Sequence, residues 1–193
     1  MTPASTASAR PIVDAAIGSL CTACVVLVES GGSRDVYAAG TLCPDPSAGP
    51  DGPCTPDTLF DLASLTKLAT GALALALVRE RVVELDMPLR EIVPDFRGGA
   101  KDDVTVAHVL THTAGLRWWK PLYEEATGLE QAVWLAAHEP LAQDRGTFVY
   151  SDLGYVMLTA GLAHAGGAPF AELLREMVLG PVEAETCEFG PRP

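Results

Sequence analysis

A proline-free apolar run, SLTKLATGALALALVRE, occupies residues 64–80 and constrains the fold more than any other stretch of the chain. Ala and Leu, which dominate it, are strong helix formers. Because apolar residues fall on nearly every side of the expected helix, we expect it to be buried on most sides. The chain has 193 residues, enough to build a core around this helix in one domain, or in one domain with a subdomain.

The segments before this helix predict a β-hairpin followed by a loop. The runs CVVLVES and RDVYAAG are apolar or β-branched and are separated by GGS, a pattern typical of two antiparallel strands. Residues 41–57 are dense in Pro, Gly and Asp, which indicates a long surface loop. A two-stranded hairpin is not a stable sheet by itself, so we expect something to pair with it.

Helices dominate the rest of the chain. Besides residues 64–80, helical segments are expected over residues 11–20, 104–112, 129–138, 151–167 and 169–181. The residues GTFVY, at 146–150, are expected to be extended. This balance predicts an α+β fold, with a hairpin and loop at 12–60 and a helical region at 61–190.

The charge balance excludes some partners. The chain has 13 Lys and Arg against 25 Asp and Glu, a formal net charge of −12, which argues against nucleic acid or an anionic membrane as a partner. No uninterrupted apolar span reaches the roughly 18 residues of a membrane helix, and the N-terminus lacks a signal-peptide pattern. We therefore expect a cytoplasmic protein.

Neither the cysteines nor the histidines predict a redox or metal site. Cys21 and Cys24 form a C-x-x-C, but the motif runs into an expected strand, whereas redox motifs sit at helix N-termini. His108 and His112 have a spacing that binds zinc on a helix, but the Glu of H-E-x-x-H is missing. We prefer a structural role, with His112 hydrogen-bonding the loop that follows, and we expect no metal and no cofactor.

Ser64 and Lys67 stand at the start of the apolar helix and share one of its faces, since residues three apart are neighbours. A serine hydroxyl needs a base within hydrogen-bond reach to become a nucleophile. A lysine serves if its pKa is lowered, and the apolar neighbours would supply the desolvation that lowers it. In the simpler interpretation, Ser64 merely starts the helix and Lys67 points into water.

Four segments in chain order resemble one family. They are TPDTLFDLASLTKLATGALALALV, VTVAHVLTHTAGL, GTFVYSDLGYVML and LLREMVLGPVEAETCEFGP. Together they resemble the serine β-lactamase and penicillin-binding-protein superfamily, most closely its class C β-lactamase-like branch, which includes esterases and D-amino-acid peptidases. The resemblance runs from about residue 12 to residue 190 and implies a β-lactamase/transpeptidase-like fold.

The resemblance implies a catalytic role for three residues. Ser64 would be the acylated nucleophile, Lys67 its hydrogen-bonded partner, and Tyr150 the general base or proton shuttle. Asp152 occupies the position of the family's Asn and would contact the substrate; an ionised Asp only accepts hydrogen bonds, which puts lactam recognition in doubt more than ester cleavage. The implied function is a serine hydrolase that acts through an acyl-enzyme on small esters, β-lactams or D-amino-acid peptides.

Two further features leave alternatives open. Trp118 and Trp119 follow the HTAGL loop, and they either wall a substrate cleft or pack in a core or interface. No Lys-Thr-Gly triplet follows Tyr150, and HAGG at 164–167 resembles the family's His-x-Gly only superficially, because it lies at an expected helix end and not on a late strand. We therefore expect a single domain, residues 1–193, that lacks the C-terminal sheet strands. A homo-oligomer or a partner chain would complete the sheet, and the alternative function is an inactive fragment or binding module.

Overall fold

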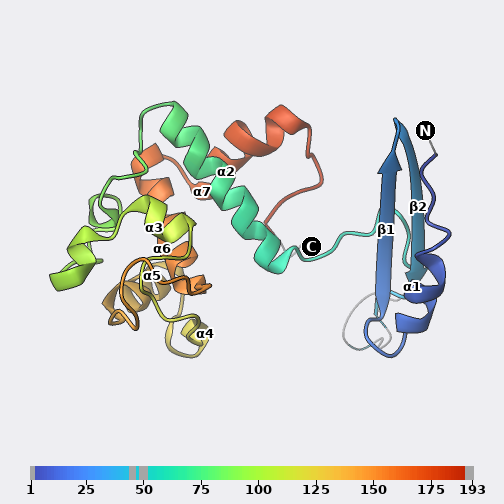
Figure 1. The fold of residues 1–193 in the computed structure, drawn as a ribbon, viewed down its shortest axis with the longest axis horizontal. Helices are drawn as coiled ribbons and strands as arrows, with labels where there is room; N and C mark the ends of the chain where they lie inside the picture. Colours follow the sequence, from blue (N-terminus) through green and yellow to red (C-terminus); the bar gives the residue numbers. More distant parts are fainter. Residues whose placement is uncertain (1–2, 44–46, 48–51, 190–193) are drawn as a thin grey trace. The chain divides into compact units, whose positions relative to one another are not determined.

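The computed structural model describes residues 3–43, 47 and 52–189 (Figure 1). Backbone contacts divide the chain into two compact units, Met1–Asp61 and Leu62–Pro193. The division lies one residue from the boundary expected between the hairpin with its loop and the helical region. That the two units belong to a single domain stays a prediction.

The first unit contains the predicted hairpin. Strand β1, Ala23–Ser30, pairs with strand β2, Ser33–Gly40, in an antiparallel register that sets Ala23 opposite Gly40. Gly31 and Gly32 form the turn with φ values of 59° and 78°, a left-handed conformation that glycine adopts without a steric cost. Helix α1, Arg10–Ala16, precedes β1 and overlaps the segment 11–20 expected to be helical, but it begins one residue earlier and ends four residues sooner. The hairpin prediction is confirmed.

The secondary-structure elements among the described residues of the second unit are all helices, joined by loops. A 3₁₀ turn, Ala63–Leu65, leads into α2, and the later helices follow in chain order: α2 Thr66–Arg79, α3 Val106–Leu110, α4 Leu122–Glu125, α5 Leu129–His138, α6 Asp152–Gly166 and α7 Phe170–Leu174. A π turn, Arg175–Leu179, and a 3₁₀ turn, Gly180–Val182, continue α7 and fill the remainder of the segment expected to be helical.

Helix α6 lies at the centre of this unit, because α2, α3, α5 and α7 all contact it (Figure 1). Two of its three glycines, Gly154 and Gly161, make the close packing possible. An ideal Cβ on Gly154 would lie 3.0 Å from Val109 Cγ1, and one on Gly161 would lie 2.9 Å from Val93 Cγ2. The helix ends at Gly167, whose φ of 68° forms a left-handed cap. Buried packing along α6 therefore fixes the position of its first residue, Asp152.

The prediction that the 64–80 helix is buried on most sides is wrong for the described residues. Leu65, Leu68 and Leu75 are 60%, 72% and 55% exposed. The buried side chains of α2 are those of Thr70, Leu73, Ala74 and Leu77. Ala and Leu favour a helix whether or not it is covered, so composition alone overstates burial.

Candidate active site

The candidate nucleophile lies directly before α2. Ser64 is the middle residue of the 3₁₀ turn, and Lys67 follows in the first turn of α2, so that Lys67 Nζ donates a hydrogen bond of 3.3 Å to Ser64 Oγ. Ala63 has a φ of 44°, which costs an L-residue about 1–2 kcal/mol. Such strain persists only where the surrounding structure enforces it, and it is concentrated at functional sites.

Tyr150 is positioned by hydrogen bonds on both sides of it. The residues 146–150 form no strand; instead the Val149 N–H donates to the His112 carbonyl at 2.9 Å. The Ser151 N–H donates to His112 Nδ1 at 3.0 Å, and Ser151 Oγ donates to the Arg117 carbonyl at 2.7 Å. Tyr150 is 45% exposed and not a buried strand residue, so its phenol is accessible to solvent and to a substrate.

The Tyr150 phenol joins Ser64 and Lys67. Its hydrogen bonds with the Ser64 hydroxyl and then with the Lys67 ammonium lower the pKa of Tyr150, against smaller opposing effects of burial and of Asp152. Lys67 Nζ lies 4.9 Å from the centre of the Tyr150 ring. The lowered pKa makes the phenolate easier to form beside Ser64, which is what a general base requires.

Asp152 holds the lysine as a cation. Its Oδ1 lies 2.7 Å from Lys67 Nζ, and the Lys67 side chain is only 16% exposed. Burial lowers the pKa of Lys67, but the hydrogen bonds to Asp152 and Tyr150 together outweigh it and raise that pKa. Desolvation acts in the expected direction, but the expectation of a lowered Lys67 pKa is wrong, because the carboxylate of Asp152 faces the ammonium.

An open hollow of about 550 Å³ lies over Ser64, Lys67 and Tyr150, whereas Asp152 does not line it. Its lining is mostly apolar, with a few polar groups that converge on Ser64. The lining residues are Leu62, Ala63, Ser64, Leu65, Lys67, Leu68, His112, Tyr150 and Tyr155. An apolar hollow with a few directed polar groups is typical of a site for a small molecule.

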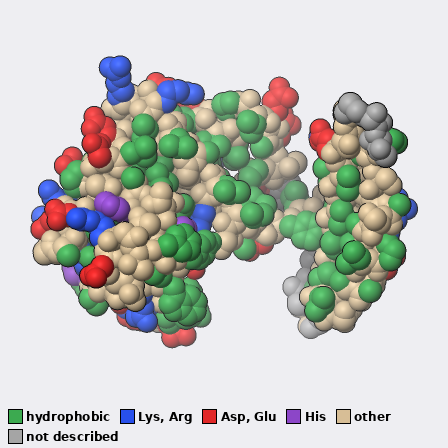
Figure 2. Space-filling view, viewed as in Figure 1, with side chains coloured by type: hydrophobic (Ala, Val, Ile, Leu, Met, Phe, Trp, Pro, Cys, Tyr) green, Lys and Arg blue, Asp and Glu red, His purple; other side chains and the backbone are tan. Residues whose placement is uncertain are grey.

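Trp118 and Trp119 do not line this hollow. Their rings stack on each other at 5.7 Å, and Trp119 also contacts Tyr123 at 6.5 Å. Trp118 is 66% exposed, so it is not a core residue, and Figure 2 shows hydrophobic side chains gathered on the surface over α4. The Trp118 backbone nevertheless touches the site, because its carbonyl accepts a 3.0 Å hydrogen bond from the Asp152 N–H.

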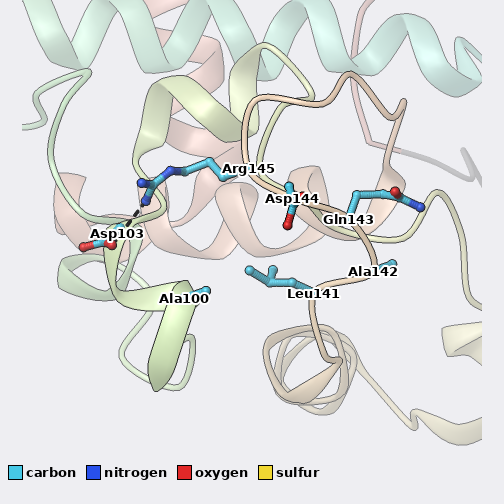
Figure 3. Close-up of a pocket in the computed structure, with 7 residues that line it drawn as sticks. All are labelled: Ala100, Asp103, Leu141, Ala142, Gln143, Asp144 and Arg145. Atoms are coloured by element: carbon cyan, nitrogen blue, oxygen red, sulfur yellow. Dashed lines mark ion pairs between the residues drawn. The ribbon is translucent and has the colours of Figure 1, made fainter.

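A second hollow, of about 490 Å³, contains none of the predicted site residues (Figure 3). It is lined by Ala100, Asp103 and residues 141–145. Arg145 points toward Asp103 and forms an ion pair with it at 3.5 Å. The lining holds no hydroxyl or thiol side chain, so this hollow offers no candidate nucleophile.

The described residues contain no metal site and no helix that could cross a membrane. No group of three or more His, Cys, Asp or Glu side chains lies close enough to hold an ion among them. His108 Nδ1 instead accepts a 3.0 Å hydrogen bond from the Thr105 N–H, in a capping box at the start of α3. No described helix is both long and apolar enough to span a bilayer.

A family model described as Beta-lactamase matches residues 15–193. The chain belongs to the beta-lactamase family. The resemblance of its four motif segments is thereby confirmed. So is the predicted fold, because a class C beta lactamase from Rhodobacter sphaeroides superposes on 93% of this chain with a TM-score of 0.76, at 25% identity.

Two members of the beta-lactamase family are similar in sequence. Esterase EstB of Burkholderia gladioli is 31% identical over 158 residues, which cover 71% of this chain and 40% of the esterase. The D-alanyl-D-alanine-carboxypeptidase/endopeptidase AmpH of Escherichia coli is 25% identical over 91% of this chain and 47% of its own length. The chain thus spans about half the length of these relatives, or less.

The sequence did not reveal that Tyr155 lies at the candidate site of this beta-lactamase-family chain. Its hydroxyl donates to the Leu110 carbonyl at 3.1 Å, and Lys67 Nζ lies 5.8 Å from its ring centre. Tyr155 follows Asp152 by three residues on α6, so helical spacing alone places the two on one face. That spacing could have indicated from the sequence that Tyr155 lies near the site.

Proposed function

We propose that this chain is a serine hydrolase that cleaves small ester or amide substrates through an acyl-enzyme on Ser64. The observation that carries the proposal is the Ser64 hydroxyl, which is hydrogen-bonded both to the Lys67 ammonium and to a Tyr150 phenol of lowered pKa. A serine so placed has the base that nucleophilic catalysis needs. The esterase and peptidase names of the relatives support a hydrolase.

In the proposed acylation, the Tyr150 phenolate takes the proton of Ser64 while Ser64 Oγ bonds to the substrate carbonyl carbon. The carbonyl oxygen becomes an oxyanion at the N-terminal end of α2, where the helix dipole is positive. When the tetrahedral adduct collapses, the bond to the leaving group breaks and Tyr150 donates its proton to that group. Lys67 keeps its charge throughout and stabilises the phenolate.

Deacylation repeats these steps with water as the nucleophile. Tyr150 takes a proton from the water, whose oxygen bonds to the acyl carbon, and the proton returns to Ser64 Oγ as the ester bond breaks. We propose that esters are preferred to β-lactams, because Asp152 adds a negative charge 2.7 Å from Lys67 and cannot donate to a substrate carbonyl.

The test is covalent labelling with a fluorophosphonate, followed by intact-mass analysis. The chain should gain one adduct that Ser64→Ala abolishes and that the control Ser8→Ala, at an exposed residue of the first unit, retains. Labelling that persists in Ser64→Ala would reject Ser64 as the nucleophile. Labelling without turnover of p-nitrophenyl butyrate would favour the alternative, a chain that binds or is acylated but does not hydrolyse.

A further inference from the structure

His112 holds the backbone on both sides of Tyr150. Its carbonyl accepts from the Val149 N–H at 2.9 Å, and its Nδ1 accepts from the Ser151 N–H at 3.0 Å. The two donors bracket Tyr150, so one residue fixes the chain immediately before and after the candidate base. His112 has a φ of 57°, an uncommon conformation that directs both of its acceptors toward the same segment.

The His112 ring also packs against the Tyr150 ring. The two centroids lie 4.5 Å apart, and on its other contact His112 stacks with Tyr155 at 5.1 Å and 30°. Tyr155 is itself anchored through its hydroxyl to the Leu110 carbonyl. The imidazole therefore joins the candidate base to the centrally packed helix α6, in addition to the two backbone bonds.

The bond to Ser151 requires a neutral imidazole with its proton on Nε2, because a protonated Nδ1 is a donor and would face the Ser151 N–H. Burial, and then the charge of Lys67 on α2, lower the pKa of His112, while Asp152 on α6 opposes them. The remaining titratable groups in contact with the ring are the phenols of Tyr150 and Tyr155. The ring is therefore a neutral acceptor at pH 7.

We infer that neutral His112 is a positioning residue that holds the Tyr150 phenol against Ser64, and that protonation of Nδ1 releases this hold. The catalytic meaning of the inference rests on the proposed function. The structural coupling between His112, Ser151 and Tyr150 is independent of the proposed function, and it can be measured without turnover.

The first experiment follows the full chain by NMR between about pH 4 and pH 8, the range in which histidines titrate. The Ser151 amide resonance should shift with the same midpoint as the His112 ring, and that midpoint should lie below the ordinary value near 6.5. A Ser151 amide that ignores the His112 titration would overturn the inference. This measurement needs no variant, so it survives any failure of a mutant to fold.

The second experiment compares His112→Asn with His164→Asn. Asn tolerates a positive φ and keeps an acceptor, but it removes the ring and its titration. His164 is an exposed histidine of α6 outside the hollow, which makes it the matched control. The phenol pKa of Tyr150, measured by ultraviolet difference titration against Tyr150→Phe, should rise in His112→Asn and stay unchanged in His164→Asn.

Fluorophosphonate labelling of the same variants connects the coupling to catalysis. His112→Asn should label about 10²-fold more slowly, which is the size of effect that a small misplacement of a reacting group produces. Its labelling rate should also no longer fall as the pH drops through the pKa of His112. An unchanged labelling rate and phenol pKa would overturn the inference. If the wild-type chain does not label at all, the proposed function fails, and the two spectroscopic measurements alone decide whether His112 positions Tyr150.

Discussion

Lys67 Nζ lies 2.7 Å from Asp152 Oδ1, so the first turn of α2 is tied to the first residue of α6 by an ion pair. This pair raises the pKa of Lys67 in spite of its burial, and it leaves Lys67 as a cation between Ser64 and Tyr150. A permanent cation cannot accept the serine proton. Together with the hydrogen bond of the Ser64 hydroxyl, it instead lowers the pKa of the neighbouring Tyr150 phenol, which serves as the base in the proposed mechanism.

The variant Asp152→Asn tests what the carboxylate does to substrate choice. An amide can donate to a carbonyl and carries no charge, so the ratio of kcat/KM for p-nitrophenyl butyrate to that for a cephalosporin should fall about tenfold, equivalent to about 1.4 kcal/mol. Steady-state assays of both substrates provide the ratio. Asp103→Asn, which removes the carboxylate of the ion pair in the second hollow, should leave it unchanged. A wild-type chain that already prefers the cephalosporin would contradict the prediction.

Tyr150→Phe should slow acylation of Ser64 by about 10²–10⁴-fold, the range for loss of a general base. The base must be deprotonated, so the wild-type labelling rate should rise with pH through the pKa of Tyr150, which is lowered from its ordinary value near 10. Labelling reactions that are quenched at a series of times, at each of several pH values, measure this dependence of the rate on pH. Tyr123→Phe removes an exposed hydroxyl outside the hollow and should follow the wild-type curve; a Tyr150→Phe variant that labels at the wild-type rate would exclude Tyr150 as the base.

Local patterns predicted much of the fold because they depend on neighbours in sequence. The glycine pair at 31–32 specified the hairpin turn, and residues 129–138 form α5 with the expected bounds. The spacing of Ser64 and Lys67 indicated that pair locally, but Tyr150, which lies 86 residues from Ser64, was found only through motif resemblance.

The electrostatics of the site could not be derived in the same way. The direction of the Lys67 pKa depends on Asp152, a residue remote in sequence that only the packing of α6 brings within 2.7 Å. The bond from Ser151 to His112 likewise joins residues 39 apart. The sequence predicted that His112 would bond the loop that follows it, but its ring and carbonyl bond Ser151 and Val149 instead, on either side of the candidate base.

Glu139 ties down the segment that carries the two exposed tryptophans. Its carboxylate accepts from Lys120 at 2.7 Å and from Arg117 at 3.3 Å, and it is only 14% exposed. These hydrogen bonds, that of Lys120 foremost, lower the pKa of Glu139 against the effect of burial. The two cations flank Trp118 and Trp119 in the sequence, so the carboxylate holds both ends of the aromatic pair.

Glu139→Gln should therefore reduce the free energy of unfolding at pH 7 by about 1.5–3 kcal/mol, as for a hydrogen bond to a charged group. Because the folded pKa is depressed, this contribution is present above the unfolded pKa, near 4.3, and is lost as the pH falls through the folded pKa. Urea titrations followed by tryptophan fluorescence should show wild type and variant converging on acidification. Glu124→Gln, at an exposed position of α4, is the control. Equal stability of Glu139→Gln and wild type at pH 7 would show that the bonds of Glu139 to Lys120 and Arg117 do not stabilise the fold.

The packing of α6 predicts that a Gly→Ala substitution destabilises the protein in α6 but stabilises it in α2. At Gly161, a new Cβ would lie 2.9 Å from Val93 Cγ2 and 3.0 Å from Ile92 Cδ1, both in the core of the helical unit. Overpacking of that kind costs about 1–3 kcal/mol, more than the roughly 1 kcal/mol that Ala gains over Gly in a helix. At Gly71, in α2, a Cβ meets no atom within 4 Å, so only the gain remains. We expect Gly161→Ala to lower the urea midpoint and Gly71→Ala to raise it, with m-values unchanged in both.

If Gly161→Ala were as stabilising as Gly71→Ala, then α6 would not be packed as closely against residues 92–93 as the structure places it, and Asp152 at its first residue would lose the rigid support that holds it against Lys67.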